Sequence, residues 1–401
     1  MKAVILAAGE GNRMRPLTYT RPKVMLPIAN KPILEHLLIE AEKVGIKEFI
    51  FIVGYHDEQI RHYFGHGRKW CVDIHYSTQR KQLGTADALR MVEGLVDGNF
   101  LMMNGDIIVN HQDIKNLTRR KNITISLFEV EDTEDLGLVE IKRGKVARIY
   151  EKVAKPPSNL ANAGLYLFTP DIFSAISQTP KSPRGEYEIT DSLQLLIDEG
   201  GHPVSYQKID YWLDPSYPWD LISANESLLA RIESQNLGEV EENVVIKGAV
   251  CIGKGTVVRS GSYIVGPVII GQDCNVGPNC YIRPCTSIGD GCHIGAAVEV
   301  KNSIIMNNSA VPHHNYVGDS VIGEGCNLGA GTKIANLRLD EQEIWVGGRN
   351  TRRRKLGAII GDNVKTGINS SINIGSMIGN DTQIGPGAIA HGIISPGSTI
   401  F

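Results

Sequence analysis

The chain has 401 residues, 42% of them hydrophobic and 21% charged, a composition typical of a folded protein with two or three domains and not of a disordered chain. Its 41 Lys and Arg against 44 Asp and Glu leave a net charge of -3, which argues against nucleic acid as a partner. The sequence has no apolar run of the roughly 18 residues that a membrane span needs, and its seven cysteines include no CxxC pair. We therefore expect a cytoplasmic protein with no membrane partner, no zinc site and no disulfide framework.

The first 200 residues alternate strand-like and helix-like segments. Apolar runs of strand length lie at 3–8, 48–54, 99–106, 123–130 and 165–168. Apolar side chains at helical spacing lie at 31–45 and 83–95. This alternation predicts an α/β domain with a largely parallel sheet over 1–230. The chain from about Trp219 to Gln235 is expected to form one helix. A linker is expected at 231–242, before a second domain at 243–401.

An internal repeat of six residues dominates the second half. Ten successive positions at this spacing carry only Ile or Val: Ile246, Ile252, Val258, Ile264, Ile270, Val276, Ile282, Ile288, Ile294 and Val300. A helix cannot produce this pattern, because six residues turn through roughly 600° on a helix. The repeat instead predicts a parallel β-solenoid with one inward aliphatic side chain per unit. Four cysteines lie four residues after such positions and are expected to pack in the core: Cys274, Cys280, Cys292 and Cys326.

The repeat is interrupted twice. After Val300 the spacing fails and resumes at Ile322, a step of 22 residues, so we expect residues 301–321 to contain an irregularity. A second interruption, between Ile334 and Ile360, contains the basic string GGRNTRRRK. Places where a local rule fails are candidate functional sites.

The string LAAGEGNRMRPLTYTRPKVMLP follows the first expected strand. Gly9 and Gly11 would permit tight turns and bring backbone N–H groups close to phosphate oxygens, which Arg13 and Lys23 could neutralise. Met14 stands where a dinucleotide-binding loop has its third glycine, which counts against a dinucleotide-binding fold. Asp106 closes a strand-like run, at the end of a strand where α/β sheets place their ligands.

The same string resembles the signature of the sugar-1-phosphate nucleotidylyltransferases, and QRKQLGTADAL, NGD, EDLGLVEI, YEK, NAGLY and WLD follow in family order. The resemblance implies a Rossmann-like nucleotidylyltransferase domain, in which a sugar 1-phosphate attacks the α-phosphorus of a nucleotide and pyrophosphate leaves. It assigns the base to Gln79, Gly84 and Thr85, the sugar to Gly137, Glu151 and Asn162, and the sugar phosphate to Lys152.

The resemblance also implies Mg²⁺, with Asp106 as one ligand. Asp214, in WLD, is similar to the second metal ligand of the thymidylyltransferase branch. Asn225 is the alternative, since the uridylyltransferase branch uses an Asn near this position. We favour Asp214, because two carboxylates neutralise a dication better than one.

The solenoid resembles the left-handed parallel β-helix of hexapeptide repeats, a family that usually forms trimers and includes many acyltransferases. The segment around VPHHNYVGDSVIGEGCNLGAGTKIAN is similar to the acetyltransferase domain of the bifunctional bacterial enzymes that form UDP-N-acetylglucosamine. His313 falls on their catalytic histidine, which takes a proton from the sugar amine before the amine attacks acetyl-CoA. His314 should face away, since adjacent residues of a strand point to opposite faces.

The other residues of this second site come from the same resemblance. The amino-sugar phosphate is assigned to Arg283, Lys301, Tyr316 and Asn327, and acetyl-CoA to Asn336, Ala330 and Lys355. The basic string that contains Lys355 is expected to form an extended loop, which could reach a neighbouring subunit and contact the phosphates of CoA there. Leu337 replaces a tyrosine of the bacterial enzymes, which leaves both glucosamine and galactosamine 1-phosphate open as the acceptor.

Together these features predict a bifunctional enzyme, closest in style to the archaeal versions. We expect it to acetylate glucosamine 1-phosphate and to couple N-acetylglucosamine 1-phosphate, or glucose 1-phosphate, to UTP or dTTP in a homotrimer or a larger assembly. One alternative is a monofunctional nucleotidylyltransferase making GDP-mannose or a similar product, with a non-catalytic oligomerising β-helix. Another is a regulatory or scaffolding subunit that keeps the fold but has lost catalytic activity. Against this alternative stand the intact residues of the nucleotidylyltransferase motifs, Gly9, Arg13, Lys23 and Asp106.

Overall fold

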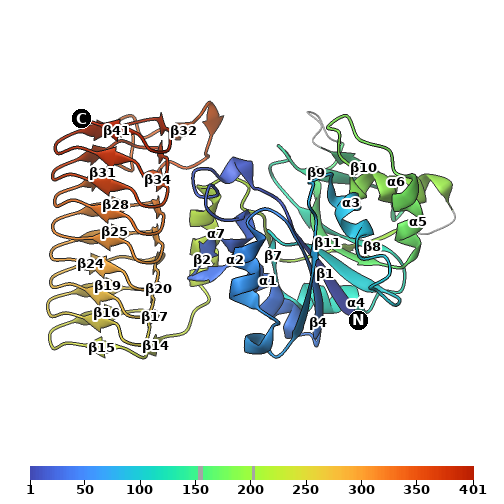
Figure 1. Cartoon of the computed structure of the whole chain (residues 1–401), viewed down its shortest axis with the longest axis horizontal. Coiled ribbons are helices and arrows are strands. Elements are labelled where there is room, and N and C mark those ends of the chain that lie inside the picture. The colour runs from blue at the N-terminus through green and yellow to red at the C-terminus, as the bar shows by residue number, and fades with distance from the viewer. Residues whose placement is uncertain (152–156, 201–203) are drawn as a thin grey trace. The chain divides into compact units, whose positions relative to one another are not determined.

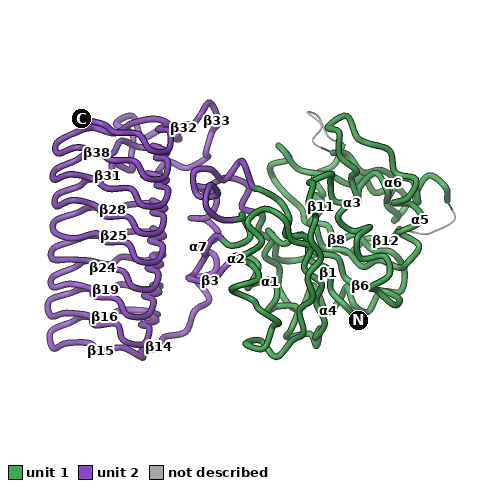
Figure 2. The backbone as a smooth tube through the Cα atoms, viewed as in Figure 1, with its two compact units in different colours: residues 1–10, 22–25, 33–214 green, residues 11–21, 26–32, 215–401 purple. Residues whose placement is uncertain are grey.

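The computed structural model describes residues 1–151, 157–200 and 204–401 (Figure 1). The chain forms two compact units whose segments interleave along the sequence (Figure 2). Unit 1 comprises Met1–Glu10, Pro22–Met25 and Ile33–Asp214; unit 2 comprises Gly11–Arg21, Leu26–Pro32 and Pro215–Phe401. Most of the glycine-containing loop of the first motif therefore clusters with the second unit. Within the described ranges, no helix has the length and apolar character that crossing a lipid bilayer requires.

Unit 1 is built on a mixed sheet in the order β10-β9-β11-β6-β1-β4-β5. In addition, β8 pairs with β11, and β12 pairs with β8. Its strands are β1 (Lys2–Ala7), β4 (Glu48–Val53), β5 (Asp73–Thr78), β6 (Phe100–Asn104), β8 (Thr124–Glu129), β9 (Gly137–Lys142), β10 (Lys145–Glu151), β11 (Leu160–Phe168) and β12 (Ser205–Lys208). A short pair, β7 (Ile108–Val109) and β13 (Trp212–Leu213), lies outside it. β1 runs parallel to β4 and β6, and β5 parallel to β4, as the alternating pattern predicts.

Helices cover both faces of this sheet, which is why β1 and β4 are apolar along nearly their whole length. Ala3 and Ile5 of β1 pack in one apolar cluster with α1 and α2, while Val4 packs in a second cluster with α3 and α6. The helices of the unit are α1 (Ile33–Glu42), α2 (Asp57–Phe64), α3 (Thr85–Arg90), α4 (His111–Thr118), α5 (Asp171–Gln178) and α6 (Ile189–Glu199), with the 3-10 turns η2 (Lys23–Met25) and η3 (Arg68–Trp70). The predicted helices at 31–45 and 83–95 are thus present but shorter.

Unit 2 contains a parallel β-helix, whose coils stack from β14 to β41 (Figure 1). Its first sheet holds β14 (Gln235–Asn236), β17 (Val250–Ile252), β20 (Val268–Ile270), β23 (Thr286–Ile288), β26 (Ile304–Ile305), β29 (Val321–Ile322), β34 (Ala358–Ile360), β37 (Ser376–Ile378) and β40 (Ile393–Ile394). Its second sheet holds β15 (Glu239–Val240), β18 (Val257–Val258), β21 (Asn275–Val276), β24 (His293–Ile294), β27 (Ala310–Val311), β30 (Asn327–Leu328), β35 (Lys365–Thr366), β38 (Gln383–Ile384) and β41 (Thr399–Ile400). Its third sheet holds β16 (Val245–Lys247), β19 (Tyr263–Val265), β22 (Tyr281–Ile282), β25 (Glu299–Lys301), β28 (Tyr316–Gly318), β31 (Lys333–Ile334), β36 (Ser371–Ile372) and β39 (Ile389–Ala390).

The remaining elements of unit 2 are short. They are α7 (Asp220–Leu229), the 3-10 turn η1 (Asn12–Met14), the pair β2 (Pro27–Ile28) and β3 (Lys31–Pro32), and the hairpin β32 (Trp345–Val346) and β33 (Arg349–Asn350). The helix expected from Trp219 to Gln235 therefore ends at Leu229. Strands β14 and β15 lie inside the segment 231–242 that the sequence analysis assigned to a linker, and they already pair with the next coil.

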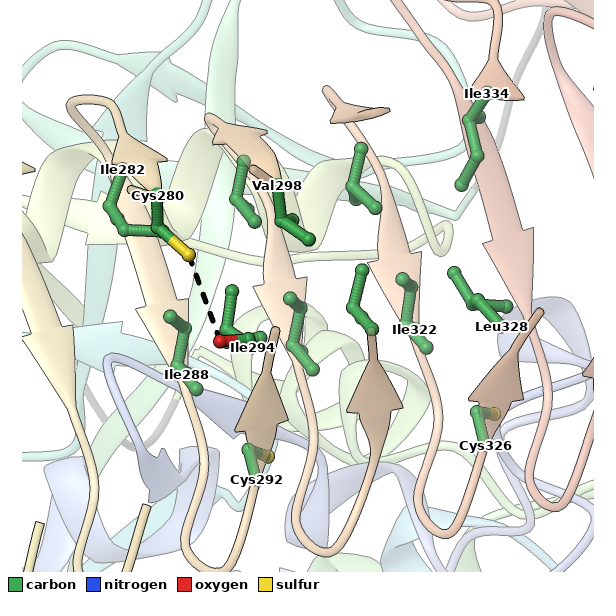
Figure 3. Packing of buried hydrophobic residues seen from close by; sticks show 14 of the residues in the cluster. Cys280, Ile282, Ile288, Cys292, Ile294, Val298, Ile322, Cys326, Leu328 and Ile334 are labelled. Carbon is green, nitrogen blue, oxygen red and sulfur yellow. Dashed lines mark hydrogen bonds between the residues drawn. The ribbon is translucent and has the colours of Figure 1, made fainter. Parts of the chain in front are cut away.

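The six-residue ladder forms the core of the β-helix (Figure 3). Its positions from Ile252 to Val300 are all at most 3% exposed, as predicted, whereas Ile246 in the first coil is 39% exposed. The four cysteines that follow ladder positions are buried free thiols, also as predicted. The Cys280 thiol donates to the carbonyl oxygens of Ile294 at 3.7 Å, the bond drawn in Figure 3, and of Gly295 at 2.8 Å.

The predicted irregularity within 301–321 is present as a change in coil length, and the coil itself continues through this segment. Val257 pairs with Asn275, 18 residues on, but Glu299 pairs with Tyr316, only 17 residues on. The corner turns after β25 and after β28 each have one residue fewer, which shifts the spacing without breaking the helix. The second interruption is a true insertion: 335–357 leaves the coil, and β29 pairs directly with β34.

Candidate active sites

Four parallel strands of unit 1 end at one edge of the sheet. Gly9 lies just beyond β1, Gln79 directly follows β5, and Asp106 lies two residues beyond β6. Because parallel strands present their carboxyl ends together, the fold brings these three predicted residues to the same edge. Gly105 belongs there for a steric reason: a Cβ on it would lie 2.7 Å from the carbonyl oxygen of Leu6.

Lys23 lies between two carboxylates at this edge. Its Nζ is 2.7 Å from Asp106 Oδ2 and 3.3 Å from Asp214 Oδ1. Burial alone would lower the pKa of Lys23, but the charges of Asp106 and Asp214 outweigh it and raise the pKa above its ordinary value. Lys23 therefore stays cationic at neutral pH.

The donor set fits a divalent cation. Two carboxylates, those of Asp106 and Asp214, converge on Lys23 Nζ. Among the described residues, no cluster of three or more His, Cys, Asp or Glu side chains that could hold a metal forms. A small hard cation that keeps several water or phosphate oxygens needs no more from the protein. Asp106 and Asp214 are 34% and 22% exposed, so substrate phosphates and water can reach them.

Asn225, the alternative metal ligand, is used differently. Its side chain is buried in unit 2, where Oδ1 accepts from the Ala29 N–H at 2.9 Å and from the Ser287 hydroxyl at 3.1 Å. Its Nδ2 donates to the Cys285 carbonyl at 3.0 Å. Both ends of the amide thus hold segments of unit 2 together, which favours Asp214.

The three residues predicted for the base lie together. Gln79 is buried and its Nε2 donates to the Gly84 carbonyl at 3.2 Å and to Asp87 at 3.0 Å. Gly84 has φ +111°, and a Cβ there would lie 2.4 Å from the Tyr187 carbonyl oxygen, so only glycine fits. Thr85 opens α3, and its hydroxyl accepts from the Ile189 N–H at 2.9 Å.

The residues predicted for the sugar lie on neighbouring strands. Gly137 pairs directly with Glu151 across β9 and β10, and a Cβ on Gly137 would lie 3.0 Å from Glu151 Oε1. Asn162, on β11, donates to the Tyr166 hydroxyl at 2.7 Å beside an irregularity in the β11–β8 register. Arg184 lies 3.7 Å from Glu151, a partner that the sequence analysis missed. Lys152 lies outside the described residues.

Gly11 and Arg13 belong to the part of the motif that clusters with unit 2. Gly11 has φ 70° before η1, a conformation that glycine adopts without strain. The Arg13 guanidinium lies 5.4 Å from the centre of the Tyr217 ring, and Arg349 lies 4.5 Å from the same ring. The part of Arg13 in phosphate binding stays a prediction from the signature.

The basic string of the insertion is engaged within unit 2. Arg353 donates to Glu226 at 2.8 Å and to Ser223 at 2.6 Å, and Arg354 pairs with Glu341 at 2.7 Å. Lys355 is exposed and bridges to Leu337 through its backbone. Its contact with CoA stays a prediction.

The second predicted site gathers at a corner of the β-helix that follows the third sheet. Arg283 comes just after β22, Lys301 ends β25, and Asn336 lies two residues beyond β31; all three strands belong to this sheet. Arg283 pairs with Glu299 at 2.9 Å, and Lys301 pairs with the buried Asp319 at 3.0 Å. Neither acidic partner was assigned from the sequence, although Asp319 lies inside the string that carries the resemblance.

Tyr316 lies beside these residues. Its hydroxyl accepts from Asn336 Nδ2 at 3.2 Å. Burial, together with the charge of Asp319, raises the pKa of the Tyr316 phenol, so it remains protonated at neutral pH. Asn327, in contrast, starts β30 of the second sheet, so the structure does not place it on the same face as Arg283, Lys301 and Tyr316.

His313 and His314 lie in the turn between β27 and β28, and both side chains are exposed. The expectation that His314 faces away was based on the alternation of side chains along a strand. That reason is wrong, because both residues lie in a turn. His314 has φ 57°, the left-handed conformation that Ala297 and Gly331 adopt at the same place in the adjoining coils. His314 N–H donates to the Ala296 carbonyl, and the His313 carbonyl accepts from Gly331 N–H, both at 3.0 Å.

This turn geometry leads to a prediction for His314. His314→Gly should change the free energy of unfolding by less than about 1 kcal/mol and leave acetyl transfer within a few-fold, because glycine adopts this φ freely. His314→Val should destabilise the protein by about 1–2 kcal/mol, since a branched side chain is strained there. Thermal unfolding and an acetylation assay check both. An inactive but folded His314→Gly protein would make His314 the functional imidazole.

Comparisons with known proteins find matches in both halves of the chain. The family model described as "Nucleotidyl transferase" matches residues 2–231, and the model described as "GMPPB C-terminal domain" matches residues 264–373. The chain is 30% identical to a putative glucose-1-phosphate thymidylyltransferase from Bacillus anthracis solved in complex with a sucrose. That match has a TM-score of 0.54 and covers 59% of this chain and 98% of the other.

Two archaeal relatives match along the full length. The "Bifunctional protein GlmU" of Methanococcus maripaludis strain C7 is 42% identical over 100% of this chain and 97% of its own. The "Bifunctional sugar-1-phosphate nucleotidylyltransferase/acetyltransferase" of Sulfurisphaera tokodaii is 41% identical over 98% of this chain and 97% of its own. The chain therefore belongs to the family of bifunctional sugar-1-phosphate nucleotidylyltransferases/acetyltransferases, a Rossmann-like nucleotidyltransferase domain followed by a left-handed β-helix.

Proposed function

We propose that the protein acetylates glucosamine 1-phosphate with acetyl-CoA and then couples N-acetylglucosamine 1-phosphate to UTP, giving UDP-N-acetylglucosamine and pyrophosphate. The proposal depends mainly on the full-length match to one relative named for both activities and to another named as bifunctional, in a chain with a candidate site in each half. Glucose 1-phosphate and dTTP are further candidate substrates, in keeping with the name of the B. anthracis protein. The seven cysteines all lie in the described ranges as free thiols, which suits the reducing cytoplasm.

For nucleotidyl transfer, we assign a Mg²⁺ ion to Asp106 and Asp214. When bound, the ion would neutralise charge on the nucleotide phosphates. Lys23, kept cationic by the same two carboxylates, supplies a fixed positive charge at the sheet edge. Gln79, Gly84 and Thr85 hold the base and Glu151 with Asn162 the sugar. An oxygen of the sugar 1-phosphate then attacks the α-phosphorus in line, so catalysis consists of positioning and charge neutralisation.

For acetyl transfer, we assign the general base to His313, on its exposed turn. Arg283 and Lys301 provide positive charge for the sugar phosphate. His313 takes a proton from the sugar amine, the nitrogen attacks the thioester carbonyl, and the CoA thiolate leaves. Asn336 is placed at the amino group, and the backbone at Ala330, one coil on from His313, along the pantetheine chain.

We also propose that the protein is a homotrimer with sites shared between neighbours. The support is that Asn327 lies on the second sheet whereas Arg283, Lys301 and Tyr316 lie on the third, so one face of one subunit does not hold all four. A second copy could present its Asn327 face to the first.

Mixed oligomers test the shared site. Lys301→Ala and Asn327→Ala should each abolish most acetyl transfer alone. Co-expressed, they should recover about a quarter of the wild-type rate, because each shared site draws its two faces at random from two subunits. Size measurement in solution accompanies the assay. A monomer, or no recovery in mixed oligomers, would contradict the shared site.

The alternative, a monofunctional enzyme making GDP-mannose or a similar product, is favoured by one observation, the match of residues 264–373 to the "GMPPB C-terminal domain". A substrate matrix distinguishes the two functions: acetyl-CoA with glucosamine and galactosamine 1-phosphate, and four nucleotides with several sugar phosphates. Acetylation of either amino sugar supports the bifunctional reading and identifies the acceptor. No acetylation with strong GTP and mannose 1-phosphate turnover would establish the alternative.

A further inference from the structure

A buried carboxylate organises the second site without facing solvent. Asp319 is 2% exposed and accepts hydrogen bonds from three side chains: Lys301 Nζ at 3.0 Å, Asn302 Nδ2 at 2.8 Å and Asn336 Nδ2 at 2.6 Å. Two of these donors, Lys301 and Asn336, are residues assigned to the amino-sugar phosphate and to acetyl transfer. A buried charge that holds several donors fixes their geometry, because each of them would lose a strong partner by turning away.

Asp319 is itself held in place. Its Oδ1 accepts from Asn302, whose Nδ2 also donates to Glu226 Oε1 at 2.7 Å. Its own N–H donates to the Lys301 carbonyl at 2.9 Å. The other carboxylate oxygen, Oδ2, is therefore left pointing at Lys301 and Asn336 with little freedom to rotate.

This arrangement decides which way the Asn336 amide faces. An ionised carboxylate only accepts hydrogen bonds, so Asn336 must turn its NH₂ group, and not its oxygen, toward Asp319. The same Nδ2 also donates to the Tyr316 hydroxyl at 3.2 Å. Asn336 Oδ1 is consequently turned away from both groups, and in the described part of the chain it has no hydrogen bond.

Gly318 provides the room for this contact. A Cβ at residue 318 would lie 2.6 Å from the Tyr316 hydroxyl and 2.7 Å from Asn336 Nδ2. Any other residue would push the amide out of its position beside Asp319. The glycine and the aspartate that follows it thus serve one purpose, the close seating of Asn336.

We propose that Asp319 is a positioning residue for acetyl transfer: it holds the Asn336 amide so that the carbonyl oxygen faces the substrate and accepts a hydrogen bond from its amino group. The inference rests on the proposed function and on the place of Asn336 at the amino group. The opposite orientation would present an NH₂ group to the amine, donor against donor. Asp319 thereby favours an amino sugar with its nitrogen correctly placed for proton removal and attack.

The test exchanges the two side chains. In Asp319→Asn the new amide can donate to Asn336 Oδ1 and so stabilise the wrong orientation. We expect the KM for glucosamine 1-phosphate to rise at least about 10-fold, with the KM for acetyl-CoA unchanged. Asn336→Asp alone places two carboxylates together and should be at least as damaging. The double variant Asp319→Asn with Asn336→Asp restores one donor facing one carboxylate, with the second oxygen toward the substrate, and should recover about 10-fold over either single variant.

Two controls accompany the exchange. Asp381→Asn changes an exposed aspartate in another turn of the same β-helix and should leave both activities unchanged. Nucleotidyl transfer, measured on every variant, reports folding of the chain. If wild-type protein acetylates no amino sugar, the proposed function fails. If wild-type protein acetylates glucosamine 1-phosphate, but Asp319→Asn keeps its KM or the double variant recovers nothing, the orienting role of Asp319 is overturned.

Discussion

Asp106→Ala should lower nucleotidyl transfer by more than about 10³-fold while acetyl transfer stays near the wild-type rate. Asp106 is one of the two carboxylates that converge on Lys23, and metal-assisted charge neutralisation contributes several kcal/mol to such a reaction. The substitution also leaves buried Lys23 with Asp214 alone, so its pKa falls toward the value that burial favours. Steady-state assays of both activities on the same preparation measure the result.

Asp214→Asn and Asn225→Ala separate the metal ligand from its alternative. We expect Asp214→Asn to lose nucleotidyl transfer, with partial recovery at high Mg²⁺. Asn225→Ala should instead lower the thermal stability of the chain, because it removes three hydrogen bonds inside unit 2. A normal rate for Asp214→Asn combined with an inactive, folded Asn225→Ala protein would reverse the assignment.

His313→Ala should reduce acetyl transfer by about 10²–10⁴-fold, the usual contribution of a general base. The backbone of its turn is held by hydrogen bonds to the coils on both sides, so the substitution should leave the fold intact. Nucleotidyl transfer should not change. The assay pairs His313→Ala with His314→Gly, which alters the neighbouring side chain of the same turn. Full acetylation by His313→Ala would remove the general-base assignment.

The regular parts of the fold were predictable from the sequence for a physical reason. The six-residue ladder and the buried strands of unit 1 each follow from periodic burial, and nine of the ten ladder positions are indeed core. The irregularity within 301–321 could be located from the sequence, but its form could not, because spacing along the chain counts residues and not turns. Two corners shorter by one residue each disturb the count while every strand keeps its partner.

The candidate sites show the same limit. The strand-end position of Asp106 could be inferred, because it depends on local sequence and a general rule for parallel sheets. The convergence of Asp214 on Lys23 joins residues 191 positions apart, which the residues alone do not reveal. Asp319 was missed because it touches the site through Lys301 and Asn336. Its signal was the short corner Gly318–Asp319, where the spacing changes.

The central claim is that one chain carries two independent active sites, and a complementation assay tests it most directly. Purified Asp106→Ala and His313→Ala proteins are each incubated with glucosamine 1-phosphate, acetyl-CoA, UTP and Mg²⁺, and then mixed. We expect almost no UDP-N-acetylglucosamine from either variant alone and restored synthesis in the mixture, because acetylated sugar phosphate released by the first variant feeds the second. No product from the mixture, with wild-type protein active and both variants folded, would contradict the two-site account.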